Sequence, residues 1–122
     1  MNTALIVDDS RTVRRFARNA LESLGFNCQE AENGLVALAA CRAEMPDLVL
    51  LDWEMPVLDG LGFAVALRAE PGGETPKILF CTTHSDLNDI ERALAAGSDE
   101  YVMKPFDREI IELKLRDLGL VT

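Results

Sequence analysis

Short, continuously apolar segments alternate along the chain with longer segments whose apolar residues recur at helical spacing. The clearest apolar runs are residues 4–7, 48–51 and 78–81, and weaker strand candidates lie at 26–31 and 101–103. Strands that are apolar on both faces are typical of a parallel sheet that is covered by helices on each side. The alternation therefore predicts five strand–helix units in a doubly wound α/β domain.

The segments between these runs carry helical signals. The first has an apolar stripe from Val13 to Leu24 that includes Phe16, and Gly25 follows it in a position suited to a helix C-terminus. The other helices are predicted at 34–44, 60–69, 86–96 and 107–118. In the last helix the apolar stripe is expected to comprise Ile110, Ile111, Leu113 and Leu118.

Length and charge exclude several classes of protein. The 122 residues predict one domain spanning 1–122, and 21 acidic against 12 basic side chains argue against a broad nucleic-acid interface. The longest stretch without a charged residue, 33–41, has nine residues, whereas a membrane span needs roughly 20 apolar ones. The first residues carry no basic region followed by an apolar one, so we expect no signal peptide. The three cysteines lack a Cys-x-x-Cys spacing and are expected to be reduced in a cytoplasmic protein.

Polar residues follow the predicted strands at the points where the strands end. They are Asp8 and Asp9, then Asp52, then Thr82 and Thr83, and finally Lys104. In an open parallel sheet, ligands bind beyond the carboxyl ends of the strands. Carboxylates that converge there repel one another unless a cation neutralises them, and a hard divalent ion with oxygen ligands suits this set. The expected metal is Mg²⁺, with Mn²⁺ as an alternative.

The same group of side chains has the parts of a phosphoryl-transfer site, in which positioning and charge neutralisation supply most of the catalysis. A carboxylate can itself act as the nucleophile and become an aspartyl phosphate. Asp8 and Asp9 share one loop and suit metal binding, whereas Asp52 stands alone at the end of the central apolar run. We therefore expect Asp52 to be the phosphoacceptor.

One basic cluster runs against the acidic trend. It lies on the first predicted helix and consists of Arg11, Arg14, Arg15 and Arg18. A solvated face opposite the apolar stripe is the simpler interpretation, and a docking patch for an acidic or phosphate-bearing partner is the alternative.

These residues occur in a combination that resembles a known family. The matching motifs are Asp8-Asp9-Ser10, Asp52-x-x-Met55-Pro56-x-x-Asp59-Gly60, Thr82 and Lys104-Pro105-Phe106. Together they resemble the receiver domain of two-component response regulators, of the single-domain, chemotaxis (CheY-like) type, over essentially the whole chain. The resemblance implies a flavodoxin-like three-layer fold with strand order 2-1-3-4-5.

The resemblance also implies roles for the acidic residues. Asp52 would accept phosphate, and Asp9 and Asp52 would bind Mg²⁺ directly. Asp8 would act largely through water, and the backbone carbonyl of Glu54 would complete the protein ligands. The Lys104-Pro105 bond is expected to be cis.

Lys104 and Thr82 would bind phosphate oxygens, and movement of Thr82 would couple to a rotamer change of Tyr101. The output face in this family is formed by the fourth helix, fifth strand and fifth helix. Ile90, Tyr101 and Lys114 occupy its contact positions.

The implied phosphate donor is a histidine kinase or a histidine phosphotransfer protein, and the implied output is contact with a downstream protein. The resemblance predicts a cytoplasmic monomer, with phosphorylation-dependent dimerisation left open, and no contact with nucleic acid or membrane. Such a domain catalyses its own phosphorylation and dephosphorylation and is not a conventional turnover enzyme.

Three positions depart from the pattern or border the phosphate. Position 54 is Glu where the chemotaxis protein has Asn, and we expect this carboxylate to slow dephosphorylation. Thr83 replaces a smaller residue and is expected to narrow access to the phosphate. His84 lies on the other flank of the path to the phosphate, and its simplest interpretation is a surface loop residue.

Two other function classes share this architecture. A magnesium-dependent phosphatase of the haloacid-dehalogenase type also uses an aspartyl nucleophile, but it carries an Asp-x-Asp motif after the first strand, which adjacent Asp8-Asp9 does not supply. A flavin-binding domain would need a phosphate loop rich in Ser, Thr or Gly, which is not apparent here.

Overall fold

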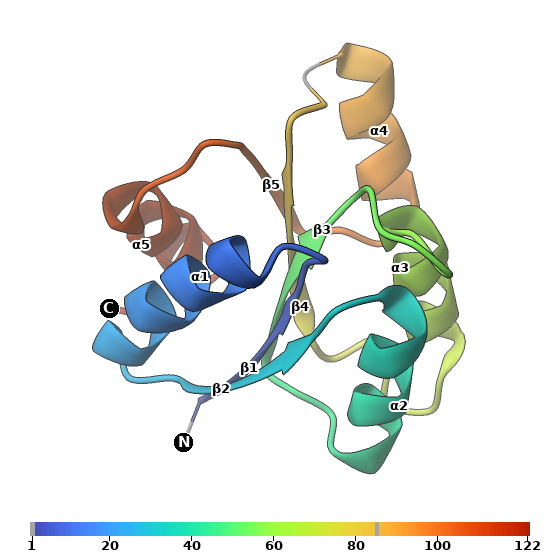
Figure 1. The fold of residues 1–122 in the computed structure, drawn as a ribbon, viewed down its shortest axis with the longest axis horizontal. Coiled ribbons are helices and arrows are strands. Elements are labelled where there is room, and N and C mark those ends of the chain that lie inside the picture. The colour runs from blue at the N-terminus through green and yellow to red at the C-terminus, as the bar shows by residue number, and fades with distance from the viewer. Residues whose placement is uncertain (1, 85) are drawn as a thin grey trace.

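The computed structural model describes residues 2–84 and 86–122, in which strands and helices alternate from β1 to α5 (Figure 1). The strands are β1 (Thr3–Val7), β2 (Asn27–Ala31), β3 (Leu48–Asp52), β4 (Lys77–Thr82) and β5 (Glu100–Met103). The helices are α1 (Arg11–Ser23), α2 (Gly34–Ala43), α3 (Gly60–Ala69), α4 (Leu87–Ala95) and α5 (Arg108–Asp117). Every predicted element is present, and its bounds agree with the prediction to within one or two residues.

The strands form a parallel sheet in the order β2-β1-β3-β4-β5. Helices α1 and α5 cover one face of the sheet, and α2, α3 and α4 cover the other (Figure 1). The predicted doubly wound, three-layer architecture and its strand order are therefore confirmed. Because β1 pairs with β3 up to Val7 opposite Leu51, the residue that follows Val7 lies beside Asp52 at the carboxyl edge of the sheet.

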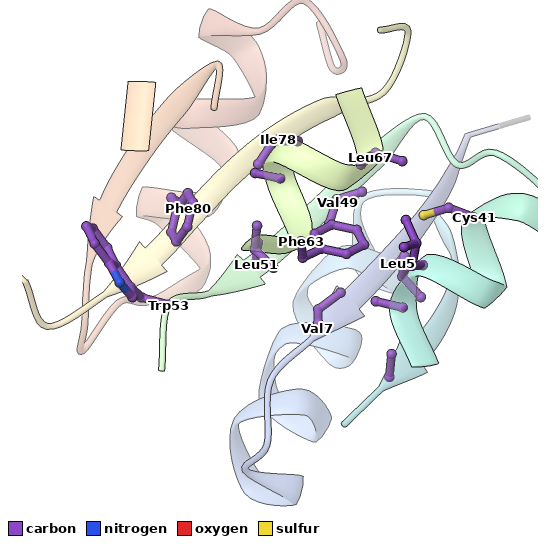
Figure 2. Packing of buried hydrophobic residues seen from close by; sticks show 14 of the residues in the cluster. Leu5, Val7, Cys41, Val49, Leu51, Trp53, Phe63, Leu67, Ile78 and Phe80 are labelled. Atoms are coloured by element: carbon purple, nitrogen blue, oxygen red, sulfur yellow. The ribbon is translucent and has the colours of Figure 1, made fainter. Parts of the chain in front are cut away.

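Alternate residues of the central strands enter two apolar clusters, one on each face. On the side of α2, α3 and α4, Leu5 and Val7 of β1 and Val49 and Leu51 of β3 surround Phe63 of α3 (Figure 2). The opposite cluster includes Ala4, Ile6, Leu48, Leu50, Leu79 and Cys81. Burial on both faces explains why these strands are continuously apolar, and it contributes about 1.5–3 kcal/mol for each large side chain.

Each helix begins where a short polar side chain caps its first turn. Five residues accept a hydrogen bond from a backbone N–H of the helix that follows: Ser10, Asn33, Asp59, Asp86 and Asp107. Such caps satisfy N–H groups that have no partner within the helix, and each contributes about 1 kcal/mol. At the end of α1, Gly25 has a φ of 94°, which suits the predicted C-terminal glycine.

Two predicted apolar stripes differ from the buried faces in the structure. The apolar stripe predicted for α1 includes Phe16, but this side chain is 44% exposed. In α5 the buried residues are Ile111 and Leu115, whereas Ile110 is 38% exposed and Leu113 is 56% exposed. The α5 stripe thus follows the i, i+4 spacing that a helix on a sheet requires, and the two exposed residues leave apolar surface on its outer side.

The three cysteines, Cys28, Cys41 and Cys81, are free and buried, as small apolar residues would be. Burial raises the pKa of Cys28 and of Cys41 to about 11. No helix in the described part of the chain is long and apolar enough to cross a membrane.

Val57, in the loop between β3 and α3, has a φ of 72° although it is a β-branched residue. That conformation costs of order 1–3 kcal/mol in a residue other than glycine, and asparagine tolerates it better. We expect Val57→Asn to raise the free energy of unfolding by about 1 kcal/mol, measured by urea denaturation. Val65 is similarly exposed but lies within α3, so Val65→Asn should give no gain. Equal effects of the two substitutions would contradict the expectation.

Candidate functional site

Four polar side chains meet at the carboxyl edge of the sheet. Asp8 follows β1, Asp52 ends β3, Thr82 ends β4 and Lys104 follows β5. The side chains of Asp8 and Asp52 are only 5% and 9% exposed. The Lys104-Pro105 peptide bond is cis, as predicted. The parallel topology thus converts residues that are far apart in the sequence into one polar group.

Lys104 is the positive charge shared by the buried carboxylates. Its Nζ donates to Oδ2 of Asp8 at 2.8 Å and to Oδ1 of Asp52 at 3.1 Å. Burial alone would lower the pKa of Lys104, but its hydrogen bonds to Asp8 and Asp52 raise it on balance. Burial and the nearby Asp8 charge raise the pKa of Asp52 to about 6, although Lys104 opposes the shift. The pocket therefore holds more negative charge than Lys104 alone stabilises.

The acidic residues form a group that could hold a metal ion. Asp8, Asp9 and Asp52 each place a carboxylate oxygen within 4.8 Å of the others, and Asp9 is the exposed member. Hard oxygen ligands of this kind suit Mg²⁺ or Mn²⁺. The group opens into a hollow lined by Asp9, Asp52, Glu54, Thr82, Thr83 and Lys104. The donor set and its access to solvent fit the metal that the sequence predicts.

The loop that carries the two acidic residues is held by several hydrogen bonds. The N–H of Asp8 donates to the carbonyl of Ala31 at 3.1 Å, and the N–H of Ser10 donates to Oδ1 of Asp8 at 2.8 Å. Arg14 donates to the carbonyl of Asp8 at 2.6 Å and pairs with Glu30 at 3.0 Å. Part of the arginine cluster is therefore structural rather than merely solvated.

The turn after Asp52 explains the spacing of the motif. Asp59 caps α3, and the N–H of Gly60 donates to the carbonyl of Trp53 at 2.8 Å. A Cβ at Gly60 would collide with the backbone carbonyl of Asp52 and crowd the ring of Phe80. Glycine at this offset lets the start of α3 lie directly against the end of β3.

His84 forms a bridge between Glu54, which lines the hollow, and Asp89 of α4. Nε2 of His84 lies 2.6 Å from Oε1 of Glu54, and Nδ1 lies 3.1 Å from Oδ2 of Asp89 in α4. The Glu54 hydrogen bond is the main cause that raises the pKa of His84, and Asp89 adds to it. The imidazole also stacks on Trp53, with ring centroids 4.4 Å apart and planes within 7°. His84 lies in the loop after β4 and is partly exposed, as a surface loop residue would be, but both of its ring nitrogens have carboxylate partners.

The three residues assigned to an output face lie on α4, β5 and α5. The Tyr101 hydroxyl donates to the backbone carbonyl of His84, and burial raises the pKa of Tyr101. Ile90 is half-buried in α4. Lys114 of α5 pairs with Glu100 at 3.3 Å. These positions span α4, β5 and α5, as the resemblance implies.

The model of the response regulator receiver domain matches residues 4–116. The chain belongs to this family. It is 38% identical over 112 residues to chemotaxis protein CheY-3 of Vibrio cholerae, which covers 91% of this chain and 86% of that protein. It is 36% identical over 114 residues to the probable transcriptional regulator ycf27 of Porphyridium aerugineum. That alignment covers 93% of this chain and 46% of the relative, so the chain spans about half of that protein's length.

Solved structures agree with the family assignment. The chemotaxis protein CheY4 of Vibrio cholerae superposes with a TM-score of 0.91 at 29% identity, covering 96% of this chain and 98% of that one. The receiver domain of a signal transduction histidine kinase from Syntrophus aciditrophicus gives 0.87 at 29% identity, covering 97% and 89%. The protein is thus a CheY-like receiver domain, a component of two-component signalling.

The structure brings the residues predicted for the receiver site together. Asp8, Asp9, Asp52, Thr82 and Lys104 share the carboxyl edge. Glu54 and Thr83 line the same hollow, and His84 reaches it through Glu54.

Sequence reasoning missed Trp53, Asp89 and Arg14 as parts of this region. A tryptophan next to the expected acceptor, and an acidic residue at the start of the helix after His84, are the signals that could have drawn attention to the first two. Nothing in the sequence shows that Arg14 reaches the backbone of Asp8.

The raised pKa of Asp52 predicts how its replacement alters stability with pH. The folded protein holds a proton on Asp52 up to about pH 6, whereas the unfolded chain releases it near 4, so stability falls as pH rises between these values. We expect Asp52→Asn to raise the free energy of unfolding by about 1–2 kcal/mol at pH 8, after allowance for screening by solvent. The gain should vanish near pH 4 in thermal melts. A gain independent of pH would contradict this assignment.

Proposed function

We propose that residues 1–122 act as a single receiver domain that accepts a phosphoryl group on Asp52 from a phosphohistidine. The observation that carries this proposal is the position of Lys104, which contacts both Asp8 and Asp52 within an otherwise acidic hollow. A buried carboxylate beside a cation, with two further carboxylates within reach of one metal ion, is suited to nucleophilic attack on a phosphoryl group.

In the proposed reaction an oxygen of Asp52 attacks the phosphorus, and the P–N bond to histidine breaks. The electron pair and a proton go to the departing imidazole. Lys104 and the Thr82 hydroxyl donate hydrogen bonds to the transferred phosphoryl oxygens. Asp9, Asp52, the carbonyl of Glu54 and, through water, Asp8 would hold Mg²⁺, or Mn²⁺ in its place, and the ion would neutralise charge on the phosphoryl group.

The proposed donor is a histidine kinase or a histidine phosphotransfer protein in the cytoplasm. The proposed output is contact between a downstream protein and the face formed by α4, β5 and α5, in which Tyr101, Ile90 and Lys114 take part. The chain is expected to be a monomer before phosphorylation. The support for these partners comes from the chemotaxis relatives and from the hydrogen bond that Tyr101 donates to the carbonyl of His84.

Beryllofluoride, which mimics a phosphoryl group on a carboxylate, provides a direct binding test. Trp53 is the single tryptophan and adjoins Asp52, so its fluorescence should change saturably when beryllofluoride is added with Mg²⁺. Asp52→Asn should bind no beryllofluoride, whereas Asp117→Asn, in α5, should respond like wild type. A wild-type response that persists in Asp52→Asn would refute the proposed acceptor.

Glu54 is expected to lengthen the lifetime of the phosphoryl group. Its carboxylate lines the hollow. Two like charges a few ångström apart in water repel each other by about 1 kcal/mol. Repulsion of this size between Glu54 and the negative charge that develops as water or hydroxide attacks the phosphoryl group slows the attack by roughly fivefold. Phosphate loss should therefore be about fivefold faster in Glu54→Asn, followed by intact mass, and unchanged in the remote Glu74→Asn. Equal rates in wild type and Glu54→Asn would remove Glu54 from this role.

A further inference from the structure

His84 has hydrogen-bond partners on four separate segments. Its N–H donates to Oγ1 of Thr82 at 3.1 Å, and its carbonyl accepts from the hydroxyl of Tyr101. Its ring nitrogens contact Glu54 of the β3–α3 loop and Asp89 of α4. Both backbone groups and both ring nitrogens are thus engaged. No other residue in the described part of the chain joins the acceptor pocket to α4 in this way.

The ring of His84 is fixed by stacking as well as by hydrogen bonds. One face lies on Trp53, the residue next to Asp52. Trp53 in turn packs on Phe80 of β4, with 5.4 Å between the ring centroids. Arg92 of α4 lies 5.5 Å from the centre of the Trp53 ring and 3.6 Å from Asp89. The imidazole is therefore in contact with Asp89 of α4 directly and with Arg92 of α4 through Trp53.

The packing of α4 favours such an effect. In the described part of the chain, Ala93 is the only fully buried residue of α4. Its apolar residues Leu87 and Leu94 are exposed. A helix with little buried apolar surface is held weakly by the core. The side-chain contacts through Asp89 and Arg92 therefore form a larger share of what fixes its position.

We infer that His84 is a positioning residue whose side chain couples occupancy of the Asp52 pocket to the position of α4, through Glu54 on one arm and Asp89 on the other. The inference rests on the proposed function. A phosphoryl group on Asp52 requires hydrogen-bond donors, and the Thr82 hydroxyl is beside it. Rotation of that hydroxyl toward the phosphoryl group moves the acceptor of the His84 N–H. The displaced imidazole then releases or reorients Asp89, and with it the N-terminal turn of α4.

This arrangement predicts that each arm of the bridge can be cut separately. Asp89→Asn removes the charged acceptor on α4, and Glu54→Gln removes the one at the pocket. Glu91 is an exposed carboxylate on the same helix. Glu91→Gln therefore serves as the control, because it removes the same charge from α4 at a residue outside the bridge. His84→Ala removes both side-chain contacts. If that variant does not fold, Asp89→Asn and Glu54→Gln still test the two contacts one at a time.

The experiment measures hydrogen exchange of the amides of residues 87–95 with and without Mg²⁺ and beryllofluoride. Fluorine NMR of bound beryllofluoride reports pocket occupancy independently in every variant. Wild type and Glu91→Gln should show a ligand-dependent change in α4 exchange, and Asp89→Asn and Glu54→Gln should lose at least about half of it at full occupancy. For each protein the measured quantity is the difference in α4 exchange with and without beryllofluoride. A variant that raises α4 exchange equally in both states leaves this difference unchanged and is therefore not mistaken for a loss of coupling.

The outcomes separate the two proposals. Full occupancy with an undiminished α4 response in Asp89→Asn and Glu54→Gln would overturn the role of His84 and leave the phosphoacceptor assignment intact. Absence of bound beryllofluoride in wild type would overturn the proposed function, and the coupling with it.

Discussion

Replacement of Arg68 by methionine is expected to destabilise the folded protein by about 3 kcal/mol. Arg68 leaves the end of α3 and donates to the carbonyls of Gly97, Gly73 and Pro76 at 2.7–3.0 Å. It also pairs with Asp99 at 2.9 Å, and the same oxygen of Asp99 accepts from the N–H of Ile78. Loss of the guanidinium leaves the three partly buried carbonyls without this donor and Asp99 without its cation, in loops that set the start of β4 and β5.

Urea denaturation measures this effect, with Arg42→Met as the matched control. Arg42 pairs with Glu70 at 2.6 Å, but its side chain is 57% exposed, so its replacement should cost about 1 kcal/mol or less. Arg68→Lys should recover only part of the loss, because one ammonium group cannot reach the acceptors that the planar guanidinium satisfies. Equal stability of Arg68→Met and Arg42→Met would show that the hydrogen bonds contribute little.

Replacement of Lys104 by methionine is expected to slow phosphorylation by acetyl phosphate by about 10²-fold or more. Lys104 is the cation that contacts Asp52 and Asp8, and in the proposed reaction it stabilises the phosphoryl oxygens as the bond to Asp52 forms. Removal of a fixed charge from a partly buried site is costly because solvent does not replace it well.

Binding of Mg²⁺ separates this effect from unfolding. Lys104→Met should still bind Mg²⁺, since the three carboxylates remain and a competing cation has gone. Lys114 also pairs with a single carboxylate, but at the surface between α5 and β5. Lys114→Met should therefore be phosphorylated at the wild-type rate. A phosphorylation rate of Lys104→Met close to that of wild type would exclude Lys104 from the transfer step.

The fold could be predicted because its signals are local and repeated. The runs at β1, β3 and β4 are buried on both faces, so their composition alone separates them from the amphipathic helices. Cap residues and Gly25 mark where α1 begins and ends. The resemblance supplied the strand order, which periodicity does not specify.

The candidate site could be predicted because parallel topology gathers strand-end residues at one edge. Asp8, Asp52 and Lys104 are recognisable from their positions after apolar runs, and the structure places them within hydrogen-bond distance. The sequence shows the fixed spacing from Asp52 to Gly60 but not its cause. That cause is steric, because a Cβ at Gly60 would collide with the backbone carbonyl of Asp52.

Contacts that depend on side-chain direction were not predictable. Whether the His84 ring reaches solvent or Asp89 depends on where α4 lies and on stacking against Trp53. Similarly, Arg14 and Arg15 both suit the polar side of α1, and only the position of β2 brings Arg14 to Glu30. The exposure of Ile110 depends on how far α5 turns about its axis on the sheet.

The most direct test of the central claim is the intact mass of the protein after incubation with acetyl phosphate and Mg²⁺, followed by peptide mapping. Wild type should gain one phosphoryl group per chain, located at Asp52, and Asp52→Asn should gain none. Omission of Mg²⁺ should strongly reduce the adduct. Sustained hydrolysis of many phosphate esters without a lasting adduct would instead indicate an aspartyl-nucleophile phosphatase. An equal adduct on Asp52→Asn would contradict the assignment of Asp52 as the phosphoacceptor.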